Sequence, residues 1–468
     1  MEAIVNFIYD NILSILMMVL LIGVGIFLTV RTKVLQFRKF GYTMKNTVGS
    51  LFDKNQHAKD KGSVSPFQAA TTALAGTIGT GSIAGVATAL VAGGPGAVFW
   101  MWISALLGMV TKYSEIVLSL KFREKNKEGA WVGGPMYYLH KGLGKKWLAI
   151  VFAIFAMIAC IGTGNATQSN AISGVLNSSL QVPTWVTGLV LTIIVALVIL
   201  GGVKRIASVN EKMVPAMAVI FIVLALVVLG INITNVPNAF VMIFTEAFNF
   251  DSVLGGVAGY GVLSAMRFGV GRGVITNEAG LGSAPIAHAA SSTTDPAKQG
   301  LWGMFEVFIT TIVICTISAL IILSSDAYAV IYAAKELDPA LNGASLSGAA
   351  FSEALPGVGQ YGVALVTIFF SLSTILGWGY YGEVCAGYLF PKHRNVAILV
   401  YRIIYVVFVF VGSVANIQIV WRLSDCFNVL MALPNLIGLV ALSKVVVNCT
   451  KEHFNKKKEE PEEAPVEE

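Results

Sequence analysis

Apolar runs long enough to cross a lipid bilayer recur along this chain from its first residues to residue 447. A transmembrane helix needs about 20 mainly apolar residues to cross roughly 30 Å of hydrocarbon. Short polar loops separate the runs, and 56% of all residues are hydrophobic while only 12% are charged. Because a soluble core cannot bury that much apolar surface, the sequence predicts an all-α polytopic membrane protein.

Eleven segments of the sequence are candidate transmembrane helices. We expect the first to be retained, because the N-terminal stretch MEAIVNFIYDN lacks the basic region of a signal peptide. The eleven segments cover residues 9–30, 66–92, 96–120, 148–176, 184–203, 213–232, 254–290, 300–324, 358–388, 395–415 and 420–447.

Positive charge in the loops predicts the orientation of the chain. Lys335 is the only basic residue in the loops on one side, while nearly all other loop Lys and Arg fall in 31–62, 121–147, 203–212, 391–394 and the tail after Lys444. Cytoplasmic loops carry the excess of Lys and Arg. The sequence therefore predicts a multi-pass protein of the cell membrane with its N-terminus outside and its C-terminus in the cytoplasm, as an odd number of spans requires.

Two of the spans contain glycine and polar residues at a depth where no water can satisfy a free backbone group. One reads TTALAGTIGTGS over residues 71–82, and the other reads GRGVITNEAGLGS over 271–283. Glycine permits unwinding, and the freed helix ends present N–H groups to anions and carbonyl groups to cations. The alternative is that these glycines only let helices pack closely, since Gly81 and Gly85 also form G-x-x-x-G.

The positions of the interrupted spans predict an internal repeat. Without the first span, ten spans remain in two groups of five, and each group begins with an interrupted helix. An odd group size makes the second group enter the membrane from the opposite side, as in an inverted repeat. We therefore expect an extra N-terminal helix with a cytoplasmic loop (1–62), a first repeat (63–232), an outer interfacial segment (233–252), a second repeat (253–448) and a disordered cytoplasmic tail (449–468).

The stretch GGPGAVFWMWISALLG, from Gly93 to Gly108, resembles the signature of the alanine or glycine:cation symporter family, also called sodium:alanine symporters. The segments AGTIGTGSIAGVA and NEAGLGSAPIAHAA resemble that family too. The resemblance implies a leucine-transporter-like fold of five-plus-five inverted repeats behind one extra helix. It also implies that the chain is no enzyme but a secondary active transporter, which brings alanine and glycine into the cell with sodium by alternating access.

The same resemblance implies where substrate and ion bind. In the first interrupted span, the substrate site takes in Thr77, Gly79, Thr80 and Gly81, with the N–H groups of Thr80 and Gly81 at the carboxylate and the carbonyl of Thr77 near the amine. Oxygen ligands suit a hard cation, and those implied for sodium are the carbonyls of Ala75, Ile78 and Phe370 and the hydroxyls of Ser373 and Thr374.

Other polar residues inside the spans leave alternatives open. Asn165 and Gln168 either contact the ligand or bridge helices, and Phe370 and Trp378 either shape the pocket or pack. Thr276, Asn277 and Gly280 are candidates for direct contact in the second interrupted span. We expect Glu278 to form an internal ion pair with Arg267 or Arg272. Glu306, Glu383 and Asp425 lie near predicted span ends. Snorkelling to the membrane surface or capping of a helix is enough to explain an acidic residue at such a position.

The sequence gives no sign of other chemistry. Cysteines and histidines show no metal-ligand spacing, so we expect no metal beyond the transported cation, no organic cofactor and no nucleic acid, and a protein that works as a monomer. An intramembrane enzyme would need a nucleophile and base at span depth, and ATP-driven transport would need a Walker A motif. Proton coupling stays open as an alternative to sodium, and a channel is a weaker alternative.

Overall fold

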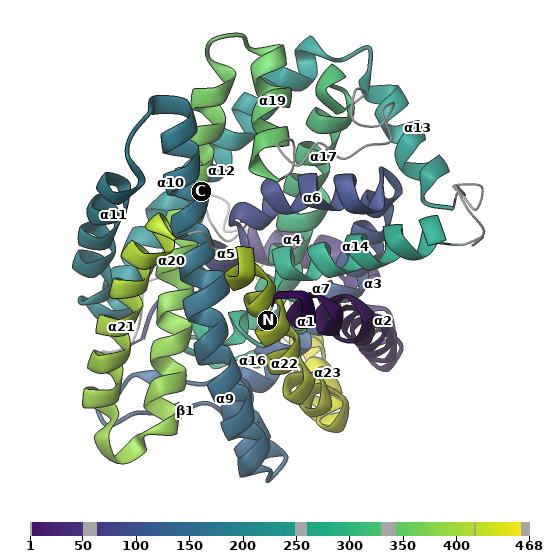
Figure 1. Ribbon diagram of the computed structural model, residues 1–468. Helices are drawn as coiled ribbons and strands as arrows, with labels where there is room; N and C mark the ends of the chain where they lie inside the picture. Colours follow the sequence, from purple (N-terminus) through teal and green to yellow (C-terminus); the bar gives the residue numbers. More distant parts are fainter. Residues whose placement is uncertain (1, 50–62, 249–259, 329–342, 416–417, 460–468) are drawn as a thin grey trace, which may run out of the picture.

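The computed structural model describes residues 2–49, 63–248, 260–328, 343–415 and 418–459 (Figure 1). Up to the end of the β-hairpin, the elements are α1 Glu2–Ile8, α2 Ser14–Arg31, α3 Leu35–Arg38, α4 Phe40–Thr47, α5 Pro66–Thr77, α6 Ala84–Gly93, α7 Gly96–Phe122, β1 Glu124–Lys125 and β2 Trp131–Val132. Then follow α8 Pro135–Tyr137, α9 Lys146–Ile161, α10 Thr167–Leu180, α11 Thr184–Ile199, α12 Gly202–Ile231 and α13 Val236–Glu246. The last are α14 Tyr260–Asn277, α15 Ala284–Ala289, α16 Pro296–Val307, α17 Thr316–Leu323, α19 Ala344–Ala354, α20 Gly359–Leu389, α21 Arg394–Val414, α22 Gln418–Ala441 and α23 Ser443–Glu459.

Helices long and apolar enough to cross a membrane dominate the structure. The described residues contain eight of them, at Val5–Arg31, Gly96–Phe122, Lys146–Leu180, Gly202–Ile231, Pro296–Leu323, Gly359–Leu389, Pro391–Val414 and Val420–Ala441. Several present apolar side chains outward, as α12 does with Val219, Val223 and Leu226. The prediction of an all-helical, multi-pass membrane protein is confirmed.

Three of the eleven predicted spans are not single long helices. The segment 66–92 is divided between α5 and α6, and 254–290 is divided between α14 and α15. The fifth span is α11, which has 16 residues. The count of eleven spans and the inverted repeat therefore remain predictions. The interruptions in the segments 66–92 and 254–290 were predicted from their glycines.

The first break, residues 78–83, lies between α5 and α6. Helix α5 begins with a capping box in which Ser65 accepts the N–H of Gln68 while the Gln68 side chain accepts the N–H of Ser65. It ends where Ile78 leaves the helical region at φ −85° and ψ 77°. Gly79 is extended, and a short 3₁₀ turn follows at Thr80–Ser82. The break thus places unwound backbone in the middle of the predicted span 66–92.

The second break, residues 278–283, lies between α14 and α15 and is held by α7. Glu278, Gly280 and Gly282 have φ values of 57°, 92° and 82°, a region that favours glycine. The Glu115 carboxylate accepts the N–H groups of Gly280 and Gly282 at 3.1 and 3.0 Å. Because these N–H groups have no water to bond with at this depth, Glu115 satisfies the backbone that the break leaves free.

Helix packing brings the two breaks together. Helix α7 packs along α14 and α16, while α5 packs against α12, α15 and α20. Helices α11 and α21 lie side by side at one edge of the bundle, and α2 lies beside α22 and α23 (Figure 1). The broken helices therefore occupy the interior, and the unbroken apolar helices surround them.

Some segments differ from the expectation. Helix α23 runs to Glu459, so residues 449–459 are helical rather than part of a disordered tail, because Val446, Cys449 and His453 share one buried face. Residues 460–468 lie outside the described part. The predicted loop 31–62 contains α3 and α4, and α13 falls within the predicted interfacial segment.

Candidate functional site

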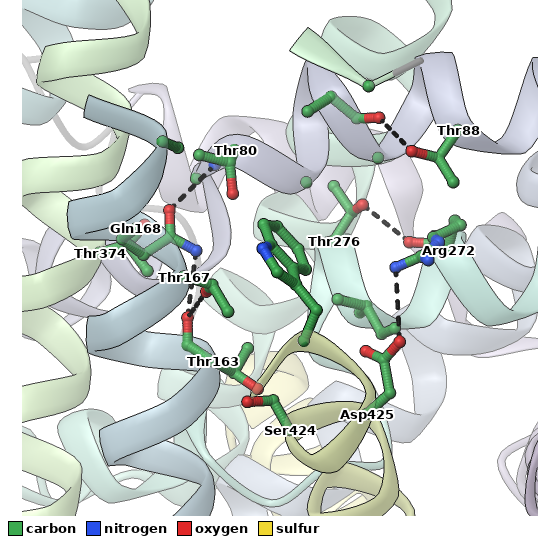
Figure 2. A pocket seen from close by; sticks show the side chains of 18 of the residues that line it. Thr80, Thr88, Thr163, Thr167, Gln168, Arg272, Thr276, Thr374, Ser424 and Asp425 are labelled. Carbon is green, nitrogen blue, oxygen red and sulfur yellow. Dashed lines mark hydrogen bonds and ion pairs between the residues drawn. The ribbon is translucent and has the colours of Figure 1, made fainter. Parts of the chain in front are cut away.

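A cavity of about 630 Å³ lies beside the first break (Figure 2). Eight residues predicted for substrate or ion line it: Thr77, Gly79, Thr80, Gly81, Gln168, Thr276, Thr374 and Trp378. Thr163 and Thr167 also line it. Charged residues line it too, namely Arg272 of α14 and Arg422 and Asp425 of α22. The structure thus brings most of the sequence-predicted site into one chamber.

Gln168 binds the unwound backbone of the first break. Its Oε1 accepts the N–H of Thr80 at 3.3 Å, and its Nε2 donates to the carbonyl of Thr163 at 3.1 Å (Figure 2). Thr163 belongs to a π-helical turn at Gly162–Ala166 that joins α9 to α10, and such turns are frequent at functional sites. The Thr80 N–H is therefore held by a neutral acceptor, the amide oxygen of a residue that also lines the chamber.

Four of the predicted ion ligands converge beside the same break. Thr374 Oγ1 lies 2.9 Å from the carbonyls of both Ala75 and Phe370, and Ser373 Oγ lies 3.3 and 2.9 Å from the same two carbonyls. All four groups offer oxygen, the ligand that hard cations prefer. Ile78 is buried at the end of α5, and its carbonyl is not among these contacts. The residues present fit a small cation held by hydroxyl and carbonyl oxygens.

Gly164 leaves room for Trp378 in the chamber wall, and Gly76 leaves room for Tyr381, which packs against Trp378. Trp378 Nε1 donates to the carbonyl of Gly76 at 3.2 Å. A Cβ atom on Gly164 would lie 2.2 Å from Trp378 Cβ, and a Cβ on Gly76 would lie 2.7 Å from Tyr381 Oη. Larger residues at Gly164 would therefore displace Trp378 from the wall, and larger residues at Gly76 would displace Tyr381 behind it.

Four residues predicted to bind substrate do not line the chamber, and a role for them in binding remains a prediction. Asn165 is buried and donates to the Tyr405 carbonyl at 2.6 Å. It therefore bridges two helices, which is one of the two roles considered for it. Asn277 bonds within the second break and to Thr311. Gly280 accepts a hydrogen bond from Asn435, and Phe370 packs against a second phenylalanine.

The predicted ion pair of Glu278 with Arg267 or Arg272 is wrong. Arg267 pairs with Asp10 at 2.8 Å, and Arg272 pairs with Asp425 at 3.8 Å. Glu278 instead accepts the Ser283 hydroxyl at 2.6 Å. The left-handed backbone at Glu278 ends the helix, so its side chain leaves the face that carries the arginines.

The acidic residues near predicted span ends are paired rather than snorkelling. Glu383 binds Arg402 through two hydrogen bonds of 2.8 and 2.9 Å. Glu306 is fully buried between Lys112 at 3.0 Å and His288 at 2.8 Å. Asp425 lines the cavity beside Arg272 (Figure 2). Each carboxylate has a cation or a histidine as partner, as charges inside membranes require.

Sequence reasoning missed two charged residues under the second break. Lys112 is buried and donates to the carbonyl of Asn277 at 2.9 Å, and Glu115 holds the glycines of that break. The signal was present, because both charges lie within the predicted span 96–120, where ionisable residues are rare and functional. Of the missed cavity residues, Thr163 and Thr167 belong to the polar stretch that contains Gln168.

Comparison with a solved structure supports the predicted fold. The chain aligns over 89% of its length, and over 98% of the other chain, with the substrate-bound outward-open state of a Na⁺-coupled sialic acid symporter, at 11% identity and a TM-score of 0.55. At that identity the likeness shows the fold, which is the predicted leucine-transporter-like fold of membrane transporters.

Comparison of sequences then gives the family. The model of the sodium:alanine symporter family matches residues 1–467, and the chain belongs to that family. It is 45% identical to the sodium/alanine symporter AgcS of Methanococcus maripaludis, over 96% of each chain. It is also 38% identical to the probable sodium/glutamine symporter GlnT of Bacillus subtilis, over 98% of this chain and 92% of that one. The family assigned from sequence motifs is confirmed, and the chain is a transporter rather than an enzyme.

Proposed function

We propose that this protein carries alanine and glycine into the cell together with sodium, by alternating access. One observation supports this most directly: the backbone at the first break, from Ala75 near the end of α5 to Thr80, contacts both candidate sites. The carbonyl of Ala75 lies among the candidate ion ligands, and the N–H of Thr80 lies at the chamber. An ion that orders this backbone also orders the substrate site, so that each ligand favours binding of the other.

The same backbone suits the zwitterion of an amino acid. N–H groups at a helix break bind a carboxylate, and we assign that role to Thr80 and Gly81, with the Thr77 carbonyl near the amine. Backbone contacts are common to all α-amino acids, so selectivity must come from the space left for the side chain. Trp378 and Thr276 line that space. Relatives named for alanine and for glutamine indicate that side-chain size varies within the family.

The decisive test of the substrate is competition for uptake of labelled alanine into proteoliposomes with an inward sodium gradient. We expect glycine to compete well and leucine to compete about 5- to 150-fold more weakly, because overfilling a packed site typically costs about 1–3 kcal/mol. Alanine amide should not compete, since it leaves the Thr80 and Gly81 N–H groups without their anion. Equal competition by leucine or glutamine would refute the small-side-chain site, and full competition by the amide would refute the carboxylate site.

Substitution of Ser373 tests the ion site. Ser373→Ala removes one oxygen ligand without touching the chamber, because Ser373 is not among the lining residues. We expect the half-saturating sodium concentration to rise while the ranking of competing amino acids stays the same. An unchanged sodium dependence would exclude this site. Uptake driven by a pH gradient without sodium would favour proton coupling instead.

Labelling of single cysteines tests the proposed orientation, with the N-terminus outside. A cysteine introduced at Glu2, before the candidate span Val5–Arg31, should react with an impermeant reagent added to intact cells. One introduced at Lys127, in the hairpin turn between β1 and β2, should react only after permeabilisation. Labelling of both from the same side would contradict the topology.

A further inference from the structure

A second hollow lies far from the chamber, at the opposite end of the Val5–Arg31 helix from Asn6, which lines the chamber. It has a volume of about 420 Å³ and lies between the segment 31–39 and helix α23. Its lining residues are Arg31, Thr32, Lys33, Arg38, Lys39, Val447, Thr450, Lys451, Phe454 and Asn455. We call this hollow the basic groove.

The charge of the basic groove is entirely positive. Five of its lining residues are Lys or Arg and none is Asp or Glu. Within the described part of the chain, none of the five forms an ion pair, although Lys39 lies over the Phe454 ring at 4.7 Å. Like charges gathered without counter-charges raise the local positive potential and attract anions. Among the residues that the structure describes, the groove therefore holds positive charge without a counter-charge, and a negatively charged ligand would supply one.

Exposed apolar side chains lie beside these charges on the same segment. Phe27 and Val30 on the last turns of α2, and Val34 and Phe37 beyond it, are 36%, 68%, 43% and 56% exposed. A bilayer-facing helix exposes such residues to lipid tails. A ligand that satisfies both features has an anionic head and an apolar body, and a free phosphate ion lacks the second.

The turn that joins the two features has an unusual backbone. Lys33 and Val34 both have left-handed φ values, of 58° and 57°. This conformation is rare outside glycine and is a genuine outlier for a β-branched residue such as Val. Strain of this kind clusters at functional sites and ligand clamps. Here the strained turn places Lys33 in the groove lining.

We propose that the basic groove binds the headgroup of an anionic phospholipid in the leaflet at the Arg31 end of α2. Basic pockets at the cytoplasmic membrane surface bind such headgroups. The phosphodiester lies between the side chains of the 31–39 segment and Lys451 of α23. Helix α23 also contacts the bundle through His453, which bonds with Asp295 before α16 and with Tyr42 of α4. The lipid thus joins α2 and α3 to the C-terminal helix.

The test is direct measurement of lipid binding by the purified full chain in a nonionic detergent. Phosphatidylglycerol is titrated and bound lipid is counted by native mass spectrometry. The variant R38Q/K451Q removes one exposed cation from each wall. The matched control K204Q/K212Q removes two exposed cations from α12, outside the groove. We expect affinity to fall roughly 5-fold for each groove residue, about 25-fold for both, and to be unchanged in the control.

Three outcomes would overturn the proposal. Equal binding of phosphatidylcholine would show that acyl chains alone are recognised. Displacement of phosphatidylglycerol by millimolar inorganic phosphate would make this a site for soluble anions. An equal loss in both double variants would show a diffuse surface effect rather than a groove. None of these readouts depends on transport, so they stand whatever the substrate proves to be.

Discussion

Lys112→Met is expected to lower the free energy of unfolding by about 3–5 kcal/mol, the usual cost of leaving a buried charge without its partner. Lys112 and Glu306 are both 0% exposed, with Nζ and Oε2 3.0 Å apart. The ammonium group also donates to the carbonyl of Asn277, the last residue of α14. Loss of the ammonium group therefore leaves the Glu306 carboxylate with only His288 as a partner. It also leaves the Asn277 carbonyl, next to the second break, without this hydrogen bond. Unfolding by SDS in mixed micelles measures the change.

Two further variants separate the ion pair from other effects of the substitution. Lys121→Met, at the exposed end of the same helix, should change stability little. The double variant Lys112→Met/Glu306→Gln should recover part of the loss, because no uncompensated charge remains. Equal stabilities of the Lys112 and Lys121 variants would contradict the buried pair, and so would a double variant no more stable than Lys112→Met alone.

Lys112 also illustrates where sequence reasoning stops. The sequence shows a charge inside a span, but its partners come from α16 and from the second break, far along the chain. Which helix faces meet is set by tertiary packing, and local pattern does not specify it. The same limit explains the error at Glu278, since Arg267 and Arg272 find their partners in the N-terminal helix and in α22.

The apolar spans and the breaks were more predictable, because local composition determines them. Glycine and threonine in the segment 71–82 predict a break, and α5 ends there at Thr77. The prediction that Ser373 and Thr374 lie near the Ala75 carbonyl rested on the resemblance to a family, because no spacing along the chain indicates this contact. Helix α23 was missed because its many charged residues suggested disorder, although Val446, Cys449 and His453 recur at helical spacing.

Gly79→Ala is expected to reduce sodium-driven alanine uptake at subsaturating sodium by about 5- to 150-fold, the effect of about 1–3 kcal/mol of overpacking. A Cβ atom on Gly79 would lie 2.6 Å from Thr374 Oγ1 and 3.4 Å from Gln168 Oε1. The backbone there is extended, so alanine fits the backbone and only the contact changes. The methyl group displaces the Thr374 hydroxyl from the Ala75 carbonyl. The half-saturating sodium concentration should therefore rise.

Gly85→Ala is the matched control, because Gly85 lines the same chamber and a Cβ there meets nothing within 4 Å. Its sodium dependence should equal that of the unmodified protein, and thermal stability measured on both variants separates binding from folding. A second comparison identifies the displaced atom. If Gly79→Ala acts through the Thr374 hydroxyl, the double variant Gly79→Ala/Thr374→Ala should require no more sodium than Thr374→Ala alone, since effects on one shared contact are not additive. Additive effects would show that the methyl group disturbs Gln168 and the Thr80 N–H instead, and would move the ion site away from Thr374.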